Sequence, residues 1–554
     1  MSLLDDVSIV VTPNGYKAGE LYAVIPSDGA ADMDVTRNTA ATRVDENGLV
    51  NYAEVIGGEE ITNGDFATDG TPSTNTWTLG WYSNTANVSI SGGKITLTNS
   101  ASESDSRAYT TNGVSSNNIL ITNQLYKLQY EVIANNGATS FKYYSSSGVF
   151  IDAPIDLGVT HTIYIKNTSN QLFLFQNATT NSNISLDNVS VKEVTRDSVP
   201  RIDYTGGGCP HILAEPQRTN LLTYSEDFSN AIWTKSGSSV TPNATTSPEG
   251  TINADKLVED TSTGGHQIQS ITSASNSTIY TTSVFVKYAG REWIRFTDAQ
   301  SSNRIHFNTL TGVFGTISGT VIDYNSTALE DGWYKLSFTT TSVATAYTPR
   351  IALAEADNDV SYTGDGVSGV YIWGAQLEQG SYPTSYIPNF GTALGVTRNQ
   401  DIFTRDGIGS LINSTEGVLF FEMAALSDDG TYRLMNIRDV SNTDNFIYFG
   451  YKNASNTIRT KIKVSGAASI DMEFVLSNET EFNKIAIKWK TNDFALWVNG
   501  VEVATDSSGV SFTANTLDEL SFDRNGSLEF NGKVKQLQVY KTALTDTQLA
   551  ALTS

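Results

Sequence analysis

The sequence predicts an all-β protein built from several domains, and three observations support this prediction. The chain has 554 residues, which is too long for one hydrophobic core and fits three or four domains. Only 17% of the residues are charged, whereas Gly (44), Tyr (25) and Phe (23) are abundant, a composition typical of strands joined by many turns. Short runs that alternate apolar and polar residues recur along most of the chain.

The charge balance excludes some partners. Asp and Glu (59) outnumber Lys and Arg (35), which gives a net charge of −24 and a field that repels phosphate backbones. We therefore expect no nucleic-acid partner, and the dispersed charges indicate a solvated surface. The one cysteine, Cys209, excludes an internal disulfide and a cysteine-based zinc site, so packing must hold the fold together.

The first residues, MSLLDDVSIV, lack the basic start and the apolar segment of a signal peptide. No stretch approaches the ~18 to 20 apolar residues of a membrane helix. We expect no membrane insertion. We expect the protein to fold in a cytoplasm, without an export signal of its own.

The first element, residues 1–56, is expected to be a small connector that residues 196–222 continue. It contains the turn signals Pro13-Asn14-Gly15 and Pro26 to Gly29 and few long apolar runs, so a large core of its own is not expected. It could order against copies of itself or against another protein. A flexible or locally packed arm is the plain alternative.

The next two elements, residues 57–195 and 223–390, share one plan. The first opens with Asn63 to Phe66 and ends in an alternating strand at Ile184 to Val191. The second opens with Ser225 to Phe228 and ends at Val370 to Leu377. Each plan extends over roughly 130 to 155 residues, the length of a two-sheet jelly roll.

Both modules resemble known families. The NGDF opening and SLDNVSVKEV ending of the first resemble galactose-binding-like jelly rolls that serve as carbohydrate-binding modules. The second contains RTNLLTYSEDFSNAIW and YIWGAQLEQGSYPTSYIP, and it is similar to a module found repeatedly in bacteriophage virion proteins, particularly tail and fibre proteins.

A repeated phrase points to an insertion. VTRN occurs at Val35 to Asn38 and again at Val396 to Asn399, within the expected linker 391–405. In the phage proteins that this chain resembles, VTRNTAATRVDENGLV often runs almost directly into VPRIDY and EPQRTNLL, whereas here roughly 140 residues separate them. We infer that the module 57–195 was inserted into a surface turn of the connector, which is physically cheap when the inserted ends lie close together.

The last element, residues 406–554, contains a predicted meander. Ile485, Ile487 and Trp489 alternate with less apolar residues, and Asn499-Gly500 can supply the positive φ angles of a tight hairpin. IAIKWK, ALWVNGVEVA and GKVKQLQVYKTALTDTQL resemble the concanavalin A-like, laminin-G-type lectin/glucanase sandwich. That resemblance implies two packed sheets, with these apolar residues, Leu496 and Val498 packed inward or across strands. A capping box at Thr545 to Gln548 predicts one short helix at the end of the chain.

We predict no enzyme and no catalytic residues. The four histidines, His161, His211, His266 and His306, lack a supporting nucleophile pattern. The concanavalin-like glucanases carry E-x-D-x-x-E, whose paired carboxylates perform glycoside hydrolysis, and this chain has no such spacing. The resemblance to that fold therefore brings no active site with it.

Sugar binding needs exposed aromatic faces beside polar side chains. The candidates are Trp81, Tyr82, Tyr143 and Tyr144, although core packing is the favoured alternative for each because strand aromatics are mostly buried. Asp187 matches where one ligand of a structural calcium often lies in carbohydrate-binding jelly rolls. A turn or strand-end role is the favoured alternative for Asp187, since calcium takes six to eight oxygens.

Together the resemblances imply a bacteriophage virion structural protein, such as a tail fibre or head fibre, exposed on the particle surface for host attachment. Residues 1–56 would anchor it to other virion proteins, and the C-terminal sandwich with the inserted module would bind host cell-surface carbohydrate. A homo-oligomer is expected, with a trimer common among such appendages. The alternatives are a decoration or connector protein that binds only virion proteins, and a polysaccharide hydrolase with accessory binding modules.

Overall fold

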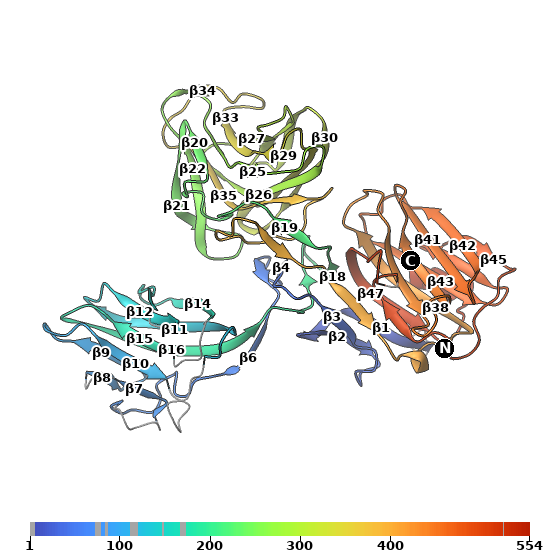
Figure 1. The fold of residues 1–554 in the computed structure, drawn as a ribbon, viewed down its shortest axis with the longest axis horizontal. Helices are drawn as coiled ribbons and strands as arrows, with labels where there is room; N and C mark the ends of the chain where they lie inside the picture. The colour runs from blue at the N-terminus through green and yellow to red at the C-terminus, as the bar shows by residue number, and fades with distance from the viewer. Residues whose placement is uncertain are drawn as a thin grey trace. The chain divides into compact units, whose positions relative to one another are not determined.

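The computed structural model describes residues 6–72, 79–83, 87–110, 120–146, 149–166, 173–524 and 526–554. The predicted all-β class is confirmed: nearly all regular structure is strand, and the short helix α2 (Asp546–Thr553) ends the chain (Figure 1). The chain forms two compact units, Glu54–Thr195 and the remainder, Met1–Ala53 with Arg196–Ser554. No described helix is long and apolar enough to cross a membrane.

The unit Glu54–Thr195 contains the expected insert, 57–195, and consists of two antiparallel sheets. The five-stranded sheet runs in the order β13 (Val149–Asp152), β12 (Phe141–Ser146), β15 (Leu174–Asn177), β10 (Ser106–Thr110), β7 (Trp81–Ser83). The six-stranded sheet runs β14 (Thr160–Lys166), β11 (Leu125–Asn136), β16 (Ser182–Thr195), β9 (Ile95–Asn99), β8 (Val88–Ile90), with β6 (Val55–Glu59) also paired to β16.

Alternation along the strands builds the core of this unit. In β11, Tyr126, Leu128, Tyr130 and Val132 are buried, and the residues between them are only partly buried. Successive strand residues point to opposite faces, so one face of each sheet packs inward and the other stays open.

The second module is also a pair of sheets. One runs β20 (Thr234–Ser236), β24 (Gln267–Gln269), β33 (Pro349–Ala354), β27 (Trp293–Asp298), β28 (Arg304–Asn308), β29 (Val313–Ser318). The other runs β21 (Ser238–Thr246), β22 (Ile252–Glu259), β35 (Gly369–Gln379), β26 (Ile279–Ala289), β31 (Trp333–Thr341), β30 (Val321–Ala328). The order β20-β24-β33-β27-β28 follows the same chain path as β7-β10-β15-β12-β13 of the insert, so the two modules share one topology.

The C-terminal sandwich is one long sheet folded over its core. Its order is β42 (Ala467–Val475), β41 (Thr457–Val464), β40 (Phe446–Tyr451), β39 (Arg433–Arg438), β46 (Glu519–Ser521), β37 (Ile402–Arg405), β3 (Met33–Thr36), β2 (Glu20–Ile25), β1 (Val7–Lys17), β47 (Gly532–Tyr540), β38 (Glu416–Ala425), β43 (Asn483–Lys490), β44 (Phe494–Val498), β45 (Val501–Asp506). β18 (His211–Ala214) also pairs with β47, and β17 (Ile202–Asp203) pairs with β18.

The N-terminal segment is part of this sandwich. Strand β1 pairs with β47 and β3 pairs with β37, so β1 to β3 bridge the two halves of the sheet. Ile9, Val11, Leu21, Met33 and Val35 are buried in the core of the sandwich. The apolar residues of this segment therefore pack against the other end of the same chain, and its ordering against copies of itself or another protein stays a prediction.

The predicted meander is present as β43, β44 and β45. Ile485, Ile487 and Trp489 are buried in the core of the sandwich, together with Leu496 and Val498. The turn between β44 and β45 contains Asn499 at φ 48° and Gly500 at φ 85°, the positive angles that a tight hairpin needs. The capping box of Thr545 and Gln548 also forms.

Short two-stranded ladders complete the second unit. They pair β4 (Thr42–Val44) with β5 (Val50–Tyr52), β19 (Arg218–Asn220) with β36 (Val396–Arg398), β23 (Thr263–Gly264) with β34 (Tyr362–Thr363), and β25 (Thr272–Ser273) with β32 (Ala346–Tyr347). The connector residues Val44 and Val50 pack against Phe285, Trp333 and Trp373 on the outer face of the β26 sheet. The connector therefore contacts the second module as well as the sandwich.

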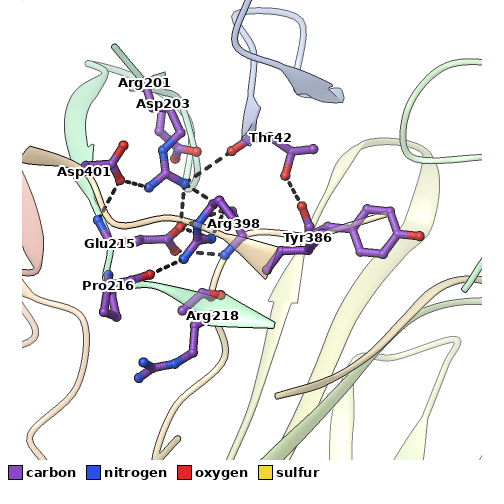
Figure 2. Close-up of polar contacts among 12 residues, drawn as sticks. Thr42, Arg201, Asp203, Glu215, Pro216, Arg218, Tyr386, Arg398 and Asp401 are labelled. Carbon is purple, nitrogen blue, oxygen red and sulfur yellow. Dashed lines mark hydrogen bonds and ion pairs between the residues drawn. The ribbon is translucent and has the colours of Figure 1, made fainter. Parts of the chain in front are cut away.

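A buried ion network holds the connector and the linker together (Figure 2). Arg37 donates to Asp401 at 2.6 Å, and Arg201 donates to both Asp401 and Glu215. Arg398 donates to Glu215 at 2.6 Å, and Ser385 donates to the same carboxylate. All five charged side chains are almost completely excluded from solvent.

The network explains the repeated VTRN phrase. Its two copies supply Arg37 and Arg398, while the PRID and EPQR phrases supply Arg201 and Glu215. Burial alone raises the pKa of a carboxyl, but the facing guanidinium groups outweigh this effect and lower the pKa values of Glu215 and Asp401. Both carboxylates are therefore ionised at neutral pH.

Candidate functional site

The five-stranded sheet of the inserted unit has one face in the core and one open face. Directly paired residues of antiparallel strands share a face, so the register places Arg107, Gln176, Lys142 and Asp152 in one row across four strands. Two further pairs, Tyr82 with Tyr109 and Tyr144 with Phe150, lie on the same face. Tyr109 follows Arg107 by two residues in β10, and Tyr144 follows Lys142 by two residues in β12. The face therefore carries four partly buried aromatic rings beside polar side chains, while Leu174 and Gln176 of its central strand β15 are buried.

The aromatic rings are paired and only partly buried. Tyr82 stacks on Tyr109, with ring centroids 4.6 Å apart and planes 10° apart. Tyr144 meets Phe150 edge-on at 5.2 Å, and the Arg107 guanidinium lies 5.1 Å from the Phe150 ring centroid. Such preformed pairs lose little conformational entropy when a ligand stacks on them.

Hydrogen bonds fix the polar side chains of this face. Asp105 accepts from Arg107 Nε and from Gln176 Nε2, both at 2.6 Å. Partial burial disfavours the charged form of Arg107, but its hydrogen bonds to Tyr109 and Asp105 raise its pKa overall. Lys142 Nζ lies 3.3 Å from Asp152. Each cation of the face has a carboxylate neighbour, so the face carries little net charge.

The structure separates the four aromatic candidates into two pairs. Trp81 is fully buried, donates its Nε1–H to Asn63 O at 3.2 Å and packs 5.5 Å from Phe66. Tyr143 is 7% exposed and belongs to the same core. For these two the packing alternative holds, since neither offers a ring face to a ligand. Tyr82 and Tyr144 lie on the open face, and their role in binding stays a prediction.

Sequence reasoning missed Arg107, Tyr109 and Phe150. The signal was present in part, because SRAYT alternates and its Arg and Tyr point to one side while Ser106 and Ala108 are buried on the other. Choosing the open side requires the strand register, which pairs Tyr109 with Tyr82 across β10 and β7.

Asp187 lies in β16 opposite Glu131 and is partly buried. Its Oδ1 accepts from the backbone N–H of Asn188 at 2.7 Å, and Asn188 Nδ2 donates to Glu131 at 3.2 Å. Within the described ranges, no group of three or more His, Cys, Asp or Glu side chains is placed to hold a metal ion. Two carboxylates fall short of the six to eight oxygens of calcium, so the calcium site remains a prediction without a visible ligand set.

A cleft of about 1020 Å³ lies in the second unit, between the connector and the second module. Two of its charged groups have protein partners: Glu215 is held by Arg201 and Arg398, and Lys335 Nζ donates to Thr384 O at 2.6 Å. Arg43, which also lines the cleft, has buried Nε and Nη1 atoms without a hydrogen-bond partner in the described part of the chain. A general acid needs a raised pKa, whereas the pKa of Glu215 is lowered. Glu215 therefore does not qualify as the acid of a hydrolytic site.

Several solved structures are similar to parts of the chain. A sialidase carbohydrate-binding module of Ruminococcus gnavus, bound to sialyllactose, is 19% identical with a TM-score of 0.22 and covers 25% of this chain and 83% of its own. Domain 4 of an arabinanase of Geobacillus stearothermophilus, in complex with arabinotriose, is 14% identical with a TM-score of 0.22 and covers 28% and 73%. A tandem binding-module pair from a Paenibacillus barcinonensis protein is 11% identical with a TM-score of 0.19 and covers 59% and 98%. Similarities of this size carry no argument about function.

No curated protein matches the chain. One family model does: residues 419–550 match the concanavalin A-like lectin/glucanases superfamily. That range contains β38 to β47 and most of the C-terminal core. The family match therefore falls on the C-terminal sandwich, and the fold of that sandwich is consistent with it.

Proposed function

We propose that this protein is a non-enzymatic, glycan-binding bacteriophage appendage, such as a tail fibre or head fibre, which is displayed on the virion surface. The open face of the inserted unit carries this proposal. Its rings at Tyr82, Tyr109, Tyr144 and Phe150 stand beside Arg107 and Gln176 on one sheet. The C–H faces of a sugar stack on such rings while its hydroxyls bond to the polar side chains.

The charge balance of this face indicates the kind of sugar. Arg107 is paired with Asp105, and Lys142 faces Asp152. A strongly acidic sugar would disturb both pairs, whereas a neutral sugar can exchange hydrogen bonds with them. The ligand proposed for the inserted unit is therefore a neutral segment of a host surface glycan.

The appendage part of the proposal is supported by the phrases of the second module that resemble phage virion proteins. A single open sheet face binds weakly, but many copies on one particle bind strongly by avidity. The proposed attachment to other virion proteins must use exposed residues of the N-terminal segment, because its apolar residues are already buried in the sandwich.

The test is binding of the purified full chain to neutral polysaccharides from the envelope of the host. The double variant Tyr82→Ala, Tyr109→Ala removes one ring pair and should weaken binding at least tenfold. Tyr164→Ala, on β14 of the other sheet of the same unit, is the matched control, since Tyr164 is 39% exposed and away from this face. If both variants bind equally well, the proposed binding site is contradicted. If the full chain is present in purified virions but binds none of these polysaccharides, the result favours the decoration alternative.

A further inference from the structure

The second module presents an arginine cluster on the sheet that corresponds to the binding face of the insert. Thr297 of β27 pairs with Arg350 of β33 on one side and with Arg304 of β28 on the other. Arg295 lies two residues before Thr297 and therefore points to the same face. The three guanidinium groups thus start from neighbouring positions of three adjacent strands, β33, β27 and β28.

The opposite face of this sheet is the core. Ile294, Phe296, Ile305, Phe307 and Ile351 are all buried there. Arg295, Arg304 and Arg350 are only partly buried, so their side chains lie on the outer face. The arginines are not needed to fill the interior of the module.

These arginines lack acidic partners. Among the described residues, none of the three forms an ion pair with an Asp or Glu side chain, although Arg350 donates to Gln269 at 2.7 Å. Burial lowers the pKa of Arg295, and the charges of Arg304 and Arg350 lower it further. Two carboxylates lie near the cluster: Asp357 accepts from Thr316, and Asp298 accepts from Thr348 N and attracts the charge of Arg350 without forming an ion pair with it. Three like charges therefore stand together with no direct ion pair among the described residues, and Asp298 compensates them only in part.

Unsatisfied donors accompany this charge. Nε of Arg295 and of Arg304 are buried and have no hydrogen-bond partner within the described part of the chain. His306, which pairs with Arg295 across β27 and β28 and is fully buried, donates from Nδ1 to Thr316 O at 2.8 Å, so Nε2 of its neutral ring is an acceptor and is not one of these donors. A buried donor without a partner is costly, so its presence points to a missing acceptor.

We propose that the β33-β27-β28 face of the second module binds an anionic group of a polysaccharide, a carboxylate or a sulfate. Guanidinium groups bind such oxyanions through short, charge-assisted hydrogen bonds. Trp293, on the same face two residues before Arg295, offers a partly buried ring beside the anion for the sugar that carries it. The site extends the proposed glycan binding, and it differs from the insert face, whose cations are paired.

The overall charge of the protein makes this site selective. A net charge of −24 repels polyanions from most of the surface, so an acidic polymer bound by this protein must find a local basic face. Nucleic acid is disfavoured for the same reason, and a single-stranded DNA probe serves as a comparison.

The experiment measures binding of the full chain to polygalacturonate, which carries carboxylates, to chondroitin sulfate, which adds sulfates, and to neutral dextran. The double variant Arg295→Gln, Arg304→Gln should weaken binding to at least one acidic polymer by tenfold or more. It should leave binding to the neutral host glycan unchanged. The control Lys287→Gln, on β26 of the other sheet, removes a positive charge of the same module and should have little effect.

The outcomes separate this inference from the proposed function. If the full chain binds neither acidic polymer, or if the double arginine variant binds them as well as the control does, the inference is overturned. The same holds if DNA binds more tightly than either acidic polysaccharide. Loss of neutral binding in the Tyr82→Ala, Tyr109→Ala variant tests the proposed function independently of all these results.

Discussion

Replacing Asp401 with Asn tests the buried ion network most sharply. The Asp401 carboxylate accepts from Arg37 at 2.6 Å, from Arg201 and from the backbone N–H of Glu215 at 2.9 Å. Asn keeps the size of the side chain but removes its charge, which leaves Arg37 without a carboxylate in a fully buried site. Breaking a buried pair in this way costs about 3 to 5 kcal/mol.

The assay is thermal and denaturant unfolding of the full chain, followed by tryptophan fluorescence and by limited proteolysis at the 391–405 linker. The control is Arg459→Gln, which breaks the more exposed pair with Asp471 and should cost at most about 1 kcal/mol. Asp401→Asn should destabilise the protein by at least about 2 kcal/mol more than the control and expose the linker to protease. Equal effects of the two substitutions would refute the view that the network holds the connector in place.

Three further predictions follow from the same contacts. The network carboxylates Glu215 and Asp401 have lowered pKa values in the folded state. Their contribution to the stability of the folded protein is therefore full above the ordinary carboxyl pKa and is lost as the pH falls through the folded-state values. Unfolding measured from pH 6 to pH 2 should show this loss of stability, and Asp401→Asn should make the loss smaller. Burial and the neighbouring Glu249 raise the pKa of Glu226 to about 8, so stability should fall between pH 4.5 and pH 8, and Glu226→Gln should remove this part of the pH dependence in melting curves. Deleting residues 1–36 removes β1 to β3 from the sandwich and should expose its core to a hydrophobic dye, whereas an unchanged melting temperature would contradict the pairing of β1 with β47.

Local patterns predicted the sandwich and the two similar modules well. The meander from Ile485 to Asp506 follows from alternation and one Asn-Gly turn, both of which depend only on neighbouring residues. The shared Asp-Phe opening and closing strand of the two modules correspond to a shared strand order. Each of these features is encoded within a few residues of where it forms.

The contacts of the N-terminal segment with the C-terminal sandwich and with the linker were not predicted. The pairing of Ile9 with Val539 places the N-terminal segment in the C-terminal sandwich, and no local pattern specifies that partner. The VTRN repeat was visible in the sequence, but the contact of Arg37 with Asp401 depends on how separate segments meet. In the same way, sequence could nominate Tyr82 and Trp81 together, whereas only the folded structure shows that Trp81 is the one that faces the core.

The most direct measurement is binding of the full chain to a panel of neutral and acidic polysaccharides from the host envelope, with the tyrosine and arginine double variants in parallel. The proposal predicts that the full chain binds, that Tyr82→Ala with Tyr109→Ala weakens neutral binding, and that Arg295→Gln with Arg304→Gln weakens acidic binding. A full chain that is present in purified virions and binds no polysaccharide of the panel would contradict glycan binding and leave a structural role.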